Sequence, residues 1–178
     1  DLSEKKTTDA FGDWCLGSGV PNVLINNAGG FEPGNVLDEK EGSLENMMHN
    51  NLYSAYHLTR KLAPQMIKNG SGHIFNICSV ASLEAYEGGG GYSISKFALH
   101  GFNQNLRHEL KTQGIKVTAV YPGAVLTDPW GNYDNSSKRT MEASDIATMI
   151  LSCTKLSAGA VLEDIRLRPR LRDLLYTF

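Results

Sequence analysis

The chain has 178 residues, 41% of them hydrophobic and 20% charged, with a formal net charge of −2 at pH 7. This length predicts a single domain over residues 1–178, and the near-neutral charge argues against a nucleic-acid-binding protein. No run of about eighteen apolar residues is present, so we expect no membrane association. Its three cysteines and five histidines lack disulfide-framework and metal-ligand spacing. We therefore predict free thiols in a reducing, cytoplasmic environment and no metal site.

The first half of the chain shows two helical patterns and two apolar runs. An amphipathic helix is expected over Glu4–Leu16, and Val23–Ile25 is typical of a parallel strand buried on both faces. A long helix is expected from about Leu44 to Lys68, with Pro64 kinking it or breaking a turn. The next strand is expected over His73–Cys78.

The second half continues the alternation. The expected elements are a helix over about Tyr92–Gln113, a strand over Ile115–Tyr121, a helix over about Ser144–Leu156 and a strand over Ala160–Leu167. Strands that alternate with helices imply βαβ units, and therefore an α/β fold with a doubly wound parallel sheet. The polar stretch Thr127–Thr140 lacks such a pattern. We expect it to fold over a substrate site as a mobile lid, with Trp130 facing the pocket.

Three of the predicted strands end in residues suited to a site. Asn26-Asn27-Ala28-Gly29 follows the first, Ser79 follows the second, and Pro122-Gly123 ends the third. Ligands of open parallel sheets bind beyond the carboxyl ends of the strands, and small residues let a ligand approach the backbone closely. Tyr92 and Lys96 begin the helix after the second strand, so the same edge should gather all of these residues.

Tyr92 and Lys96 are four residues apart, which places them on one face of a helix. A tyrosine ordinarily loses its proton near pH 10, so it is a poor acid or base at neutral pH. A cation within about 4–6 Å favours the phenolate, and we expect Lys96 to lower the pKa of Tyr92. Because Tyr–Lys pairs at this spacing are also common on solvated helix faces, the functional interpretation of the pair depends on the neighbouring motifs.

Together these motifs resemble the short-chain dehydrogenase/reductase family over nearly the whole chain. Ser79 precedes Tyr92 by thirteen positions and Asn51 precedes Ser79 by twenty-eight, both at the usual spacing of the family. The matching segments are Asn26-Asn27-Ala28-Gly29 for NNAG, Tyr92-Ser93-Ile94-Ser95-Lys96 for YxxxK, and Pro122-Gly123 with Thr127 for PG…T. Each motif alone is common, but their order and spacing together make coincidence a poor explanation.

The resemblance implies an NAD(P)-dependent oxidoreductase that interconverts a small carbonyl and its alcohol. Tyr92 would exchange the proton and Ser79 would hold the substrate oxygen. Lys96 would bind the nicotinamide ribose, and Asn51 would hold a water behind Lys96. The hydride would come from the cofactor, because no side chain can supply one. The residues implied to contact the cofactor are Asp1, Leu2, Asn27, Ala28, Gly29, Tyr92, Lys96, Pro122, Gly123, Val125 and Thr127.

Each role has a structural alternative. Ser79 could cap the turn after its strand, Asn51 could hydrogen-bond at a helix kink, and Thr127 could cap a helix. Asn27 is expected to tie neighbouring strands in any case. The main alternative function is a reductase-like fold kept as a non-catalytic NAD(P)-binding or regulatory protein, and a third is an isomerase or dehydratase that recycles its cofactor. The sequence keeps Ser79, Tyr92, Lys96 and Asn51 together, and this favours the catalytic interpretation over a non-catalytic one.

The chain departs from the family at its start. Family members open with a strand and a TGxxxGxG turn that cradles the cofactor pyrophosphate, and this sequence has no such motif. Asp1-Leu2 resembles the pair that ends the third strand of the family. We therefore expect a Rossmann-type sheet truncated at the N-terminus, with Val23–Ile25 as an open edge. The residue that separates NAD from NADP would lie upstream, so the cofactor is left as NAD or NADP.

The resemblance also implies a small carbonyl or alcohol as substrate and a homodimer or homotetramer. Members of the family commonly pair through the two long helices. The second of these helices carries Phe97, Leu99, Phe102 and Leu106. These residues offer more apolar surface than one sheet contact requires, unless all four simply pack on the sheet. We expect a two-fold, four-helix interface.

Overall fold

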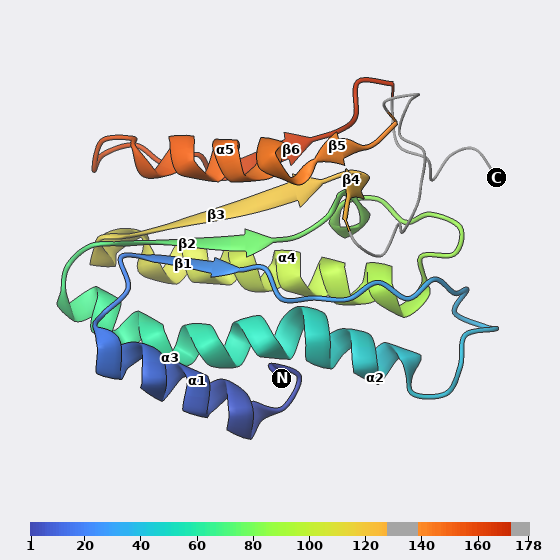
Figure 1. The fold of residues 1–178 in the computed structure, drawn as a ribbon, viewed down its shortest axis with the longest axis horizontal. Helices are drawn as coiled ribbons and strands as arrows, with labels where there is room; N and C mark the ends of the chain where they lie inside the picture. Colours follow the sequence, from blue (N-terminus) through green and yellow to red (C-terminus); the bar gives the residue numbers. More distant parts are fainter. Residues whose placement is uncertain (128–138, 172–178) are drawn as a thin grey trace.

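The computed structural model describes residues 1–127 and 139–171. Its centre is a four-stranded parallel sheet in the order β1-β2-β3-β6. The strands are β1 (Val23–Asn26), β2 (Gly72–Ile77), β3 (Ile115–Pro122) and β6 (Asp164–Leu167). A short parallel pair, β4 (Val125–Leu126) and β5 (Met141–Glu142), stands apart from this sheet. Because the central strands all run the same way, their carboxyl ends meet at one edge (Figure 1).

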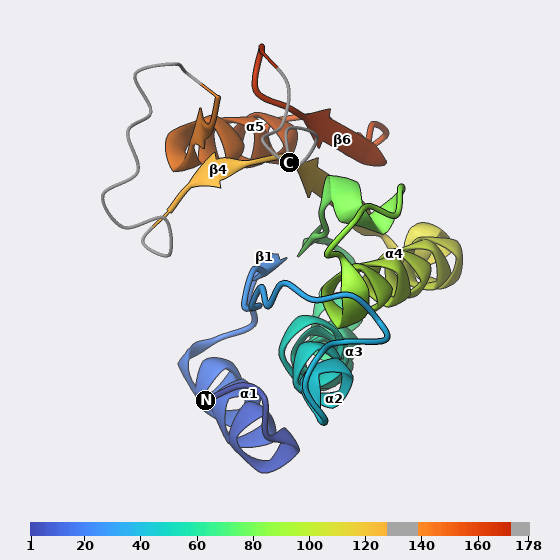
Figure 2. The same ribbon diagram turned by 90° about the vertical axis from the view of Figure 1, so that its right-hand side faces the viewer.

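Helices cover both faces of the sheet (Figure 2). The helices α3 (Ser54–Lys68) and α4 (Gly90–Leu110) pack on one face, and α5 (Ala143–Thr154) packs on the other. The N-terminal helix α1 (Lys5–Ser18) packs against α3. This arrangement confirms the predicted α/β, doubly wound parallel fold. None of the helices in the described ranges is long and apolar enough to cross a membrane.

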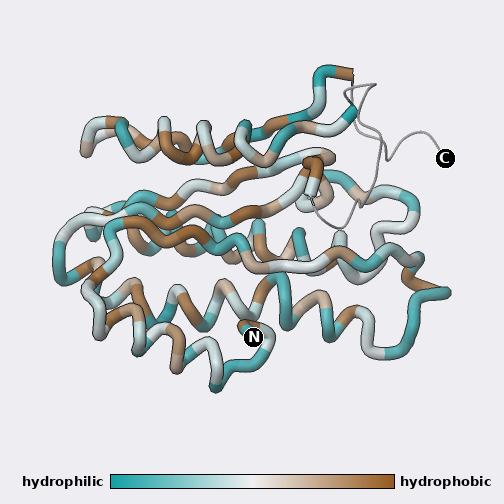
Figure 3. The backbone as a smooth tube through the Cα atoms, in the orientation of Figure 1, coloured by the Kyte–Doolittle hydropathy of each residue, from teal (hydrophilic) through white to brown (hydrophobic). Residues whose placement is uncertain are grey.

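Burial along the strands follows this layering. The side chains of Ile74 and Phe75 in β2 are fully buried on opposite faces, and the central strands stand out as apolar in Figure 3. In β1, by contrast, Leu24 is buried while Val23 and Ile25 are 38% and 45% exposed. The prediction of burial on both faces is therefore wrong for β1. Among the described residues β1 pairs only with β2, so it is an edge strand, as expected.

The helix expected over residues 44–68 is interrupted, but not at its proline. Helix α2 (Ser43–Met48) passes into a π-helical turn, His49–Tyr53, before α3 begins. Pro64 lies within α3, and the helix continues beyond it. Single π turns often occur at functional sites, and this one contains Asn51.

The strand expected over residues 160–167 is also shorter than predicted. Its register with β3 begins at the pair Ala119–Asp164, and residues 161–163 before it are exposed. The predicted lid, including Trp130, falls largely on residues 128–138, which lie outside the described part of the chain.

A ladder of buried asparagines ties the layers together. The Asn26 side-chain N–H groups donate to Asn76 Oδ1 of β2 at 2.8 Å and to Thr59 Oγ1 of α3 at 2.9 Å. Asn76 in turn donates to Asn103 Oδ1 of α4 at 2.8 Å. The sequence prediction gave the strand-tying role to Asn27, which is wrong. Alternation along β1 turns Asn26 inward, whereas Asn27 follows the strand and is exposed.

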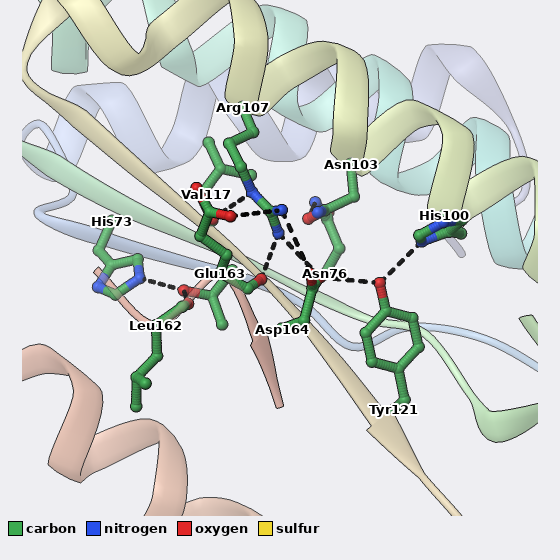
Figure 4. Close-up of polar contacts among 11 residues, drawn as sticks. His73, Asn76, His100, Asn103, Arg107, Val117, Tyr121, Leu162, Glu163 and Asp164 are labelled. Atoms are coloured by element: carbon green, nitrogen blue, oxygen red, sulfur yellow. Dashed lines mark hydrogen bonds and ion pairs between the residues drawn. The ribbon is translucent and has the colours of Figure 1, made fainter. Parts of the chain in front are cut away.

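A second polar group anchors β6 to the sheet and to α4 (Figure 4). The Tyr121 hydroxyl donates to Asp164 Oδ1 at 3.0 Å and lies 2.7 Å from His100 Nδ1. The Arg107 guanidinium lies 3.0 Å from the same carboxylate oxygen. Partial burial raises the pKa of Asp164, but the hydrogen bond and positive charge of Arg107 outweigh it, so the pKa is lowered overall. The network therefore holds Asp164 ionised.

The asparagine ladder predicts a large loss of stability on Asn76→Ala. The substitution removes the donor to Asn103 and the acceptor of Asn26 inside the core, and leaving buried polar groups unpaired should cost about 2 kcal/mol or more. Urea unfolding of the full-length protein would measure this change. The matched control is Asn105→Ala, because Asn105 is exposed on α4, the helix that carries Asn103, and within the described ranges its side chain bonds only the Gly101 carbonyl of that helix. Equal stabilities of the two variants would contradict the prediction.

Candidate active site

Ser79 stands at the carboxyl end of β2 and begins a short 3-10 turn, Val80–Ser82. Its Oγ accepts from Ala81 N–H at 3.1 Å, and its own N–H donates to Ser82 Oγ at 3.1 Å. The capping alternative is therefore confirmed. The same side chain also interacts with Tyr92 and lowers the pKa of that phenol. The turn thus fixes a hydroxyl beside the tyrosine, and the two roles are compatible.

Helix α4 places Tyr92 and Lys96 one turn apart on the face nearest this serine. Lys96 is only 7% exposed, and its Nζ donates to the Ile77 carbonyl at 2.9 Å. The same nitrogen lies 5.9 Å from the centre of the Tyr92 ring. The predicted group of Ser79, Tyr92 and Lys96 is therefore brought together at the carboxyl edge of the sheet.

Burial dominates the electrostatics of this group. It raises the pKa of Tyr92, and the hydrogen bond with Ser79 lowers it only in part. It also lowers the pKa of Lys96 to about 8 and raises the pKa of the Cys78 thiol to about 12. The expectation that Lys96 would lower the pKa of Tyr92 is wrong for this structure, because burial dominates and the side chains that shift this pKa are Ser79 and Cys78, not Lys96. Tyr92 is accordingly a protonated phenol at neutral pH.

Asn51 lies in the π turn and is 1% exposed. Its Oδ1 accepts from Gly30 N–H at 2.8 Å, and its Nδ2 donates to Gly30 O at 3.1 Å and to Ser95 Oγ at 2.9 Å. Ser95 donates in turn to the Tyr92 carbonyl at 2.7 Å. The alternative of a hydrogen-bonding residue at a helix irregularity is therefore confirmed for its side chain.

The residues after β1 form the second wall of the site. Asn27, Ala28 and Gly29 are exposed at the end of the strand. A Cβ added to Gly29 would lie 2.6 Å from Asn51 Oδ1 and 3.6 Å from Lys96 Nζ, so only glycine fits without a shift. An apolar groove of about 230 Å³ continues from here along β1, lined by Ala28, Asn27 and Leu2 among others.

The remaining predicted cofactor residues are placed less directly. Asp1 is exposed, and its carboxylate accepts from Ser3 N–H at 2.8 Å. Pro122, Gly123 and Val125 are half-buried near the carboxyl ends of β3 and β6, where Gly123 N–H donates to Leu167 O at 2.8 Å. Thr127 is exposed at the end of the described segment. Within the described ranges none of these residues is hydrogen-bonded to Tyr92.

Sequence reasoning missed three contributors. Gly30 and Ser95 are the partners of Asn51, and Phe31 meets the Tyr92 ring edge to face with ring centres 4.9 Å apart. Ser95 lies inside the YxxxK segment, and Gly30 and Phe31 directly follow NNAG. Their position within or next to the family motifs is the sequence feature that could have identified them.

The hydrogen-bond donors of the site fit a dinucleotide cofactor. A lysine ammonium has three N–H donors, and among the described residues Lys96 Nζ uses one of them, on Ile77 O. The other two suit the paired hydroxyls of a ribose. Gly29, whose lack of a side chain keeps the approach to Lys96 open, fits the same group.

Comparison of the sequence with known proteins gives an independent indication of its family. Residues 3–138 match the sequence profile of the short chain dehydrogenase family. A sepiapterin reductase of Chlorobaculum tepidum is 34% identical over 154 residues, which are 86% of this chain and 63% of that protein. The chain therefore spans less than two thirds of that relative.

Two solved structures share the fold. A metagenomic short-chain oxidoreductase in complex with NADP has a TM-score of 0.81 at 30% identity, with 97% of this chain and 72% of that one covered. A 4-hydroxyisoleucine dehydrogenase complexed with NADH has a TM-score of 0.80 at 25% identity, with 94% and 76% covered. With its profile matched over most of its length and its fold shared with these enzymes, the chain belongs to the short-chain dehydrogenase family.

Proposed function

We propose that this chain carries the catalytic residues of an NAD(P)-dependent oxidoreductase that interconverts a small carbonyl and its alcohol. The observation that carries the proposal is the joint placement of Ser79, Tyr92 and Lys96 at the carboxyl edge of the sheet, with Tyr92 protonated by its buried surroundings. Related structures that hold NADP or NADH support either cofactor. The substrate class stays open among ketones, sugars, acyl thioesters and pteridine-like heterocycles.

In the proposed reaction, each residue has the role that its hydrogen-bonding groups allow. When bound, NAD(P) exchanges the hydride that no side chain can supply. In the direction of reduction, Ser79 and Tyr92 hold the substrate oxygen, and Tyr92 gives it a proton as general acid. In the direction of oxidation, Tyr92 takes the proton back. Lys96 holds the ribose hydroxyls with the N–H donors that Ile77 leaves free.

Asn51 has a supporting role for Ser79, Tyr92 and Lys96. We propose that it also holds a water that links Lys96 to solvent. Its side-chain atoms already bond Gly30 and Ser95, so such a water would bind its main-chain carbonyl. The side chain itself then fixes the geometry around the relay.

Tyr92→Phe tests the acid–base role. In the full-length enzyme this change should lower kcat by about two orders of magnitude or more, which is the range of general acid–base catalysis. The dissociation constant for NAD(P)H should hardly change, because the ring and Lys96 remain. Steady-state kinetics and fluorescence titration would measure the two effects, with Tyr53→Phe as the control, since Tyr53 is exposed in the π turn. A Tyr92→Phe enzyme that keeps more than about a tenth of the wild-type turnover would refute the role.

We also propose a two-fold assembly through α3 and α4. Leu99 is buried, and Phe102 and Leu106 pack half-buried against the core, so most of the expected apolar stripe serves the fold. Ile94 and Phe97, 43% and 42% exposed and three residues apart, form the apolar outer surface of α4. These two residues support a helix-to-helix contact between copies.

The assembly predicts that Phe97→Glu makes the full-length protein monomeric at micromolar concentration, because a carboxylate would be buried without a partner at an interface of at least about 1,000 Å². Light scattering coupled to gel filtration would show the change of mass. The matched control is Leu151→Glu on α5, where Leu151 is 57% exposed on the opposite face. A wild-type protein that is already monomeric would overturn the proposal.

A further inference from the structure

The loop of residues 31–42, between β1 and α2, lies against the N-terminal end of α4, where Tyr92 is located (Figure 1). Gly34 N–H donates to Gly88 O at 3.1 Å, and Gly88 N–H donates to Asn35 Oδ1 at 2.9 Å. The Phe31 ring meets the Tyr92 ring edge to face. This loop therefore contacts both the tyrosine and the backbone that precedes it.

Glu39 makes the most specific of these contacts. Its Oε2 accepts from Gly91 N–H at 2.9 Å, and its side chain is half-buried. Helix α4 has no acidic residue in its first turn and no side-chain cap at Gly89. The first N–H groups of a helix lack partners within the helix and attract negative charge. Glu39 supplies that charge from a loop more than fifty residues upstream, at the residue immediately before Tyr92.

The glycine run before Tyr92 permits this approach. Gly90 has φ +35, and a Cβ there would collide with both Glu39 Oε2 and Gly34 O. A Cβ on Gly91 would lie 3.0 Å from Leu44 Cα. Side chains at these positions would push the loop away from the helix. The glycines and the glutamate therefore form one packed unit.

We propose that Glu39 is a positioning residue for Tyr92, acting through the first turn of α4. The inference rests on the proposed function, since it gives Tyr92 the proton transfer. The carboxylate holds the Gly91 amide, which fixes the helix start and with it the direction of the Tyr92 hydroxyl. A reacting group displaced by about 1 Å can lose about a hundredfold in rate, so a contact remote from the substrate can matter.

Kinetics of the full-length enzyme test the proposal. Glu39→Ala should lower kcat by about tenfold or more with an unchanged dissociation constant for NAD(P)H. Glu39→Gln keeps an oxygen acceptor and should retain at least about a third of wild-type kcat. The matched control is Glu41→Ala, because Glu41 is exposed and makes no hydrogen bond to another residue of the described ranges. Equal kcat values for Glu39→Ala and Glu41→Ala would overturn the proposal.

A double-mutant cycle separates positioning from general damage. If Glu39 acts through Tyr92, then Glu39→Ala should cost nothing further in the Tyr92→Phe background. A loss of the same size in both backgrounds would show that Glu39 acts elsewhere and would overturn the proposal.

A readout that needs no activity keeps this test apart from that of the proposed function. Hydrogen exchange at the Gly91 amide should be faster in Glu39→Ala than in wild type and unchanged in Glu41→Ala. Unchanged exchange in Glu39→Ala would overturn the inference even in an active enzyme. Faster exchange in a protein without NAD(P)H-dependent turnover would uphold the contact and refute the proposed function instead.

Discussion

The side-chain amide of Asn51 joins three segments that are distant in the sequence. It bonds both backbone groups of Gly30 after β1 and the Ser95 hydroxyl of α4, and it sits in the π turn between α2 and α3. An amide has both donors and an acceptor, so one side chain can satisfy all these partners. The relative positions of the β1 loop and the helix that carries Tyr92 and Lys96 depend on this junction. A glycine at position 29 is required beside it, because a side chain there would strike the amide.

The side chains next to Asn51 are buried away from water, and this burial sets their protonation states. Lys96 is buried as an ammonium whose pKa is lowered to about 8, and Tyr92 keeps its proton at neutral pH. Lys96 has no carboxylate partner among residues 1–127 and 139–171, and a buried lysine in such surroundings is costly, a cost that is typical of functional sites. The same burial raises the pKa of the Cys78 thiol to about 12, so this thiol is a poor acid at neutral pH. The protonated state of Tyr92 supports its proposed role as the acid in carbonyl reduction.

Much of this arrangement could be predicted from the sequence. Apolar periodicity located the main helices and strands, and parallel topology predicted that Ser79 and Tyr92 would meet. Details that depend on three-dimensional contacts could not be predicted. The choice of Asn26 over Asn27 as the strand tie depends on where β1 ends. The π turn depends on partners of Asn51 that are distant in the sequence, and the pKa of Tyr92 depends on burial. Glu39 belongs to no motif, and only the fold brings it to Gly91.

The most direct test of the account is the fate of deuterium that replaces both hydrogens at C4 of the nicotinamide in NADH or NADPH. The full-length enzyme should transfer the label to the carbon of the substrate carbonyl, while the proton on the new hydroxyl comes from solvent by way of Tyr92. Mass spectrometry of the alcohol would show one deuterium on that carbon. Product that forms without label, or cofactor that keeps its deuterium with every carbonyl offered, would contradict the account.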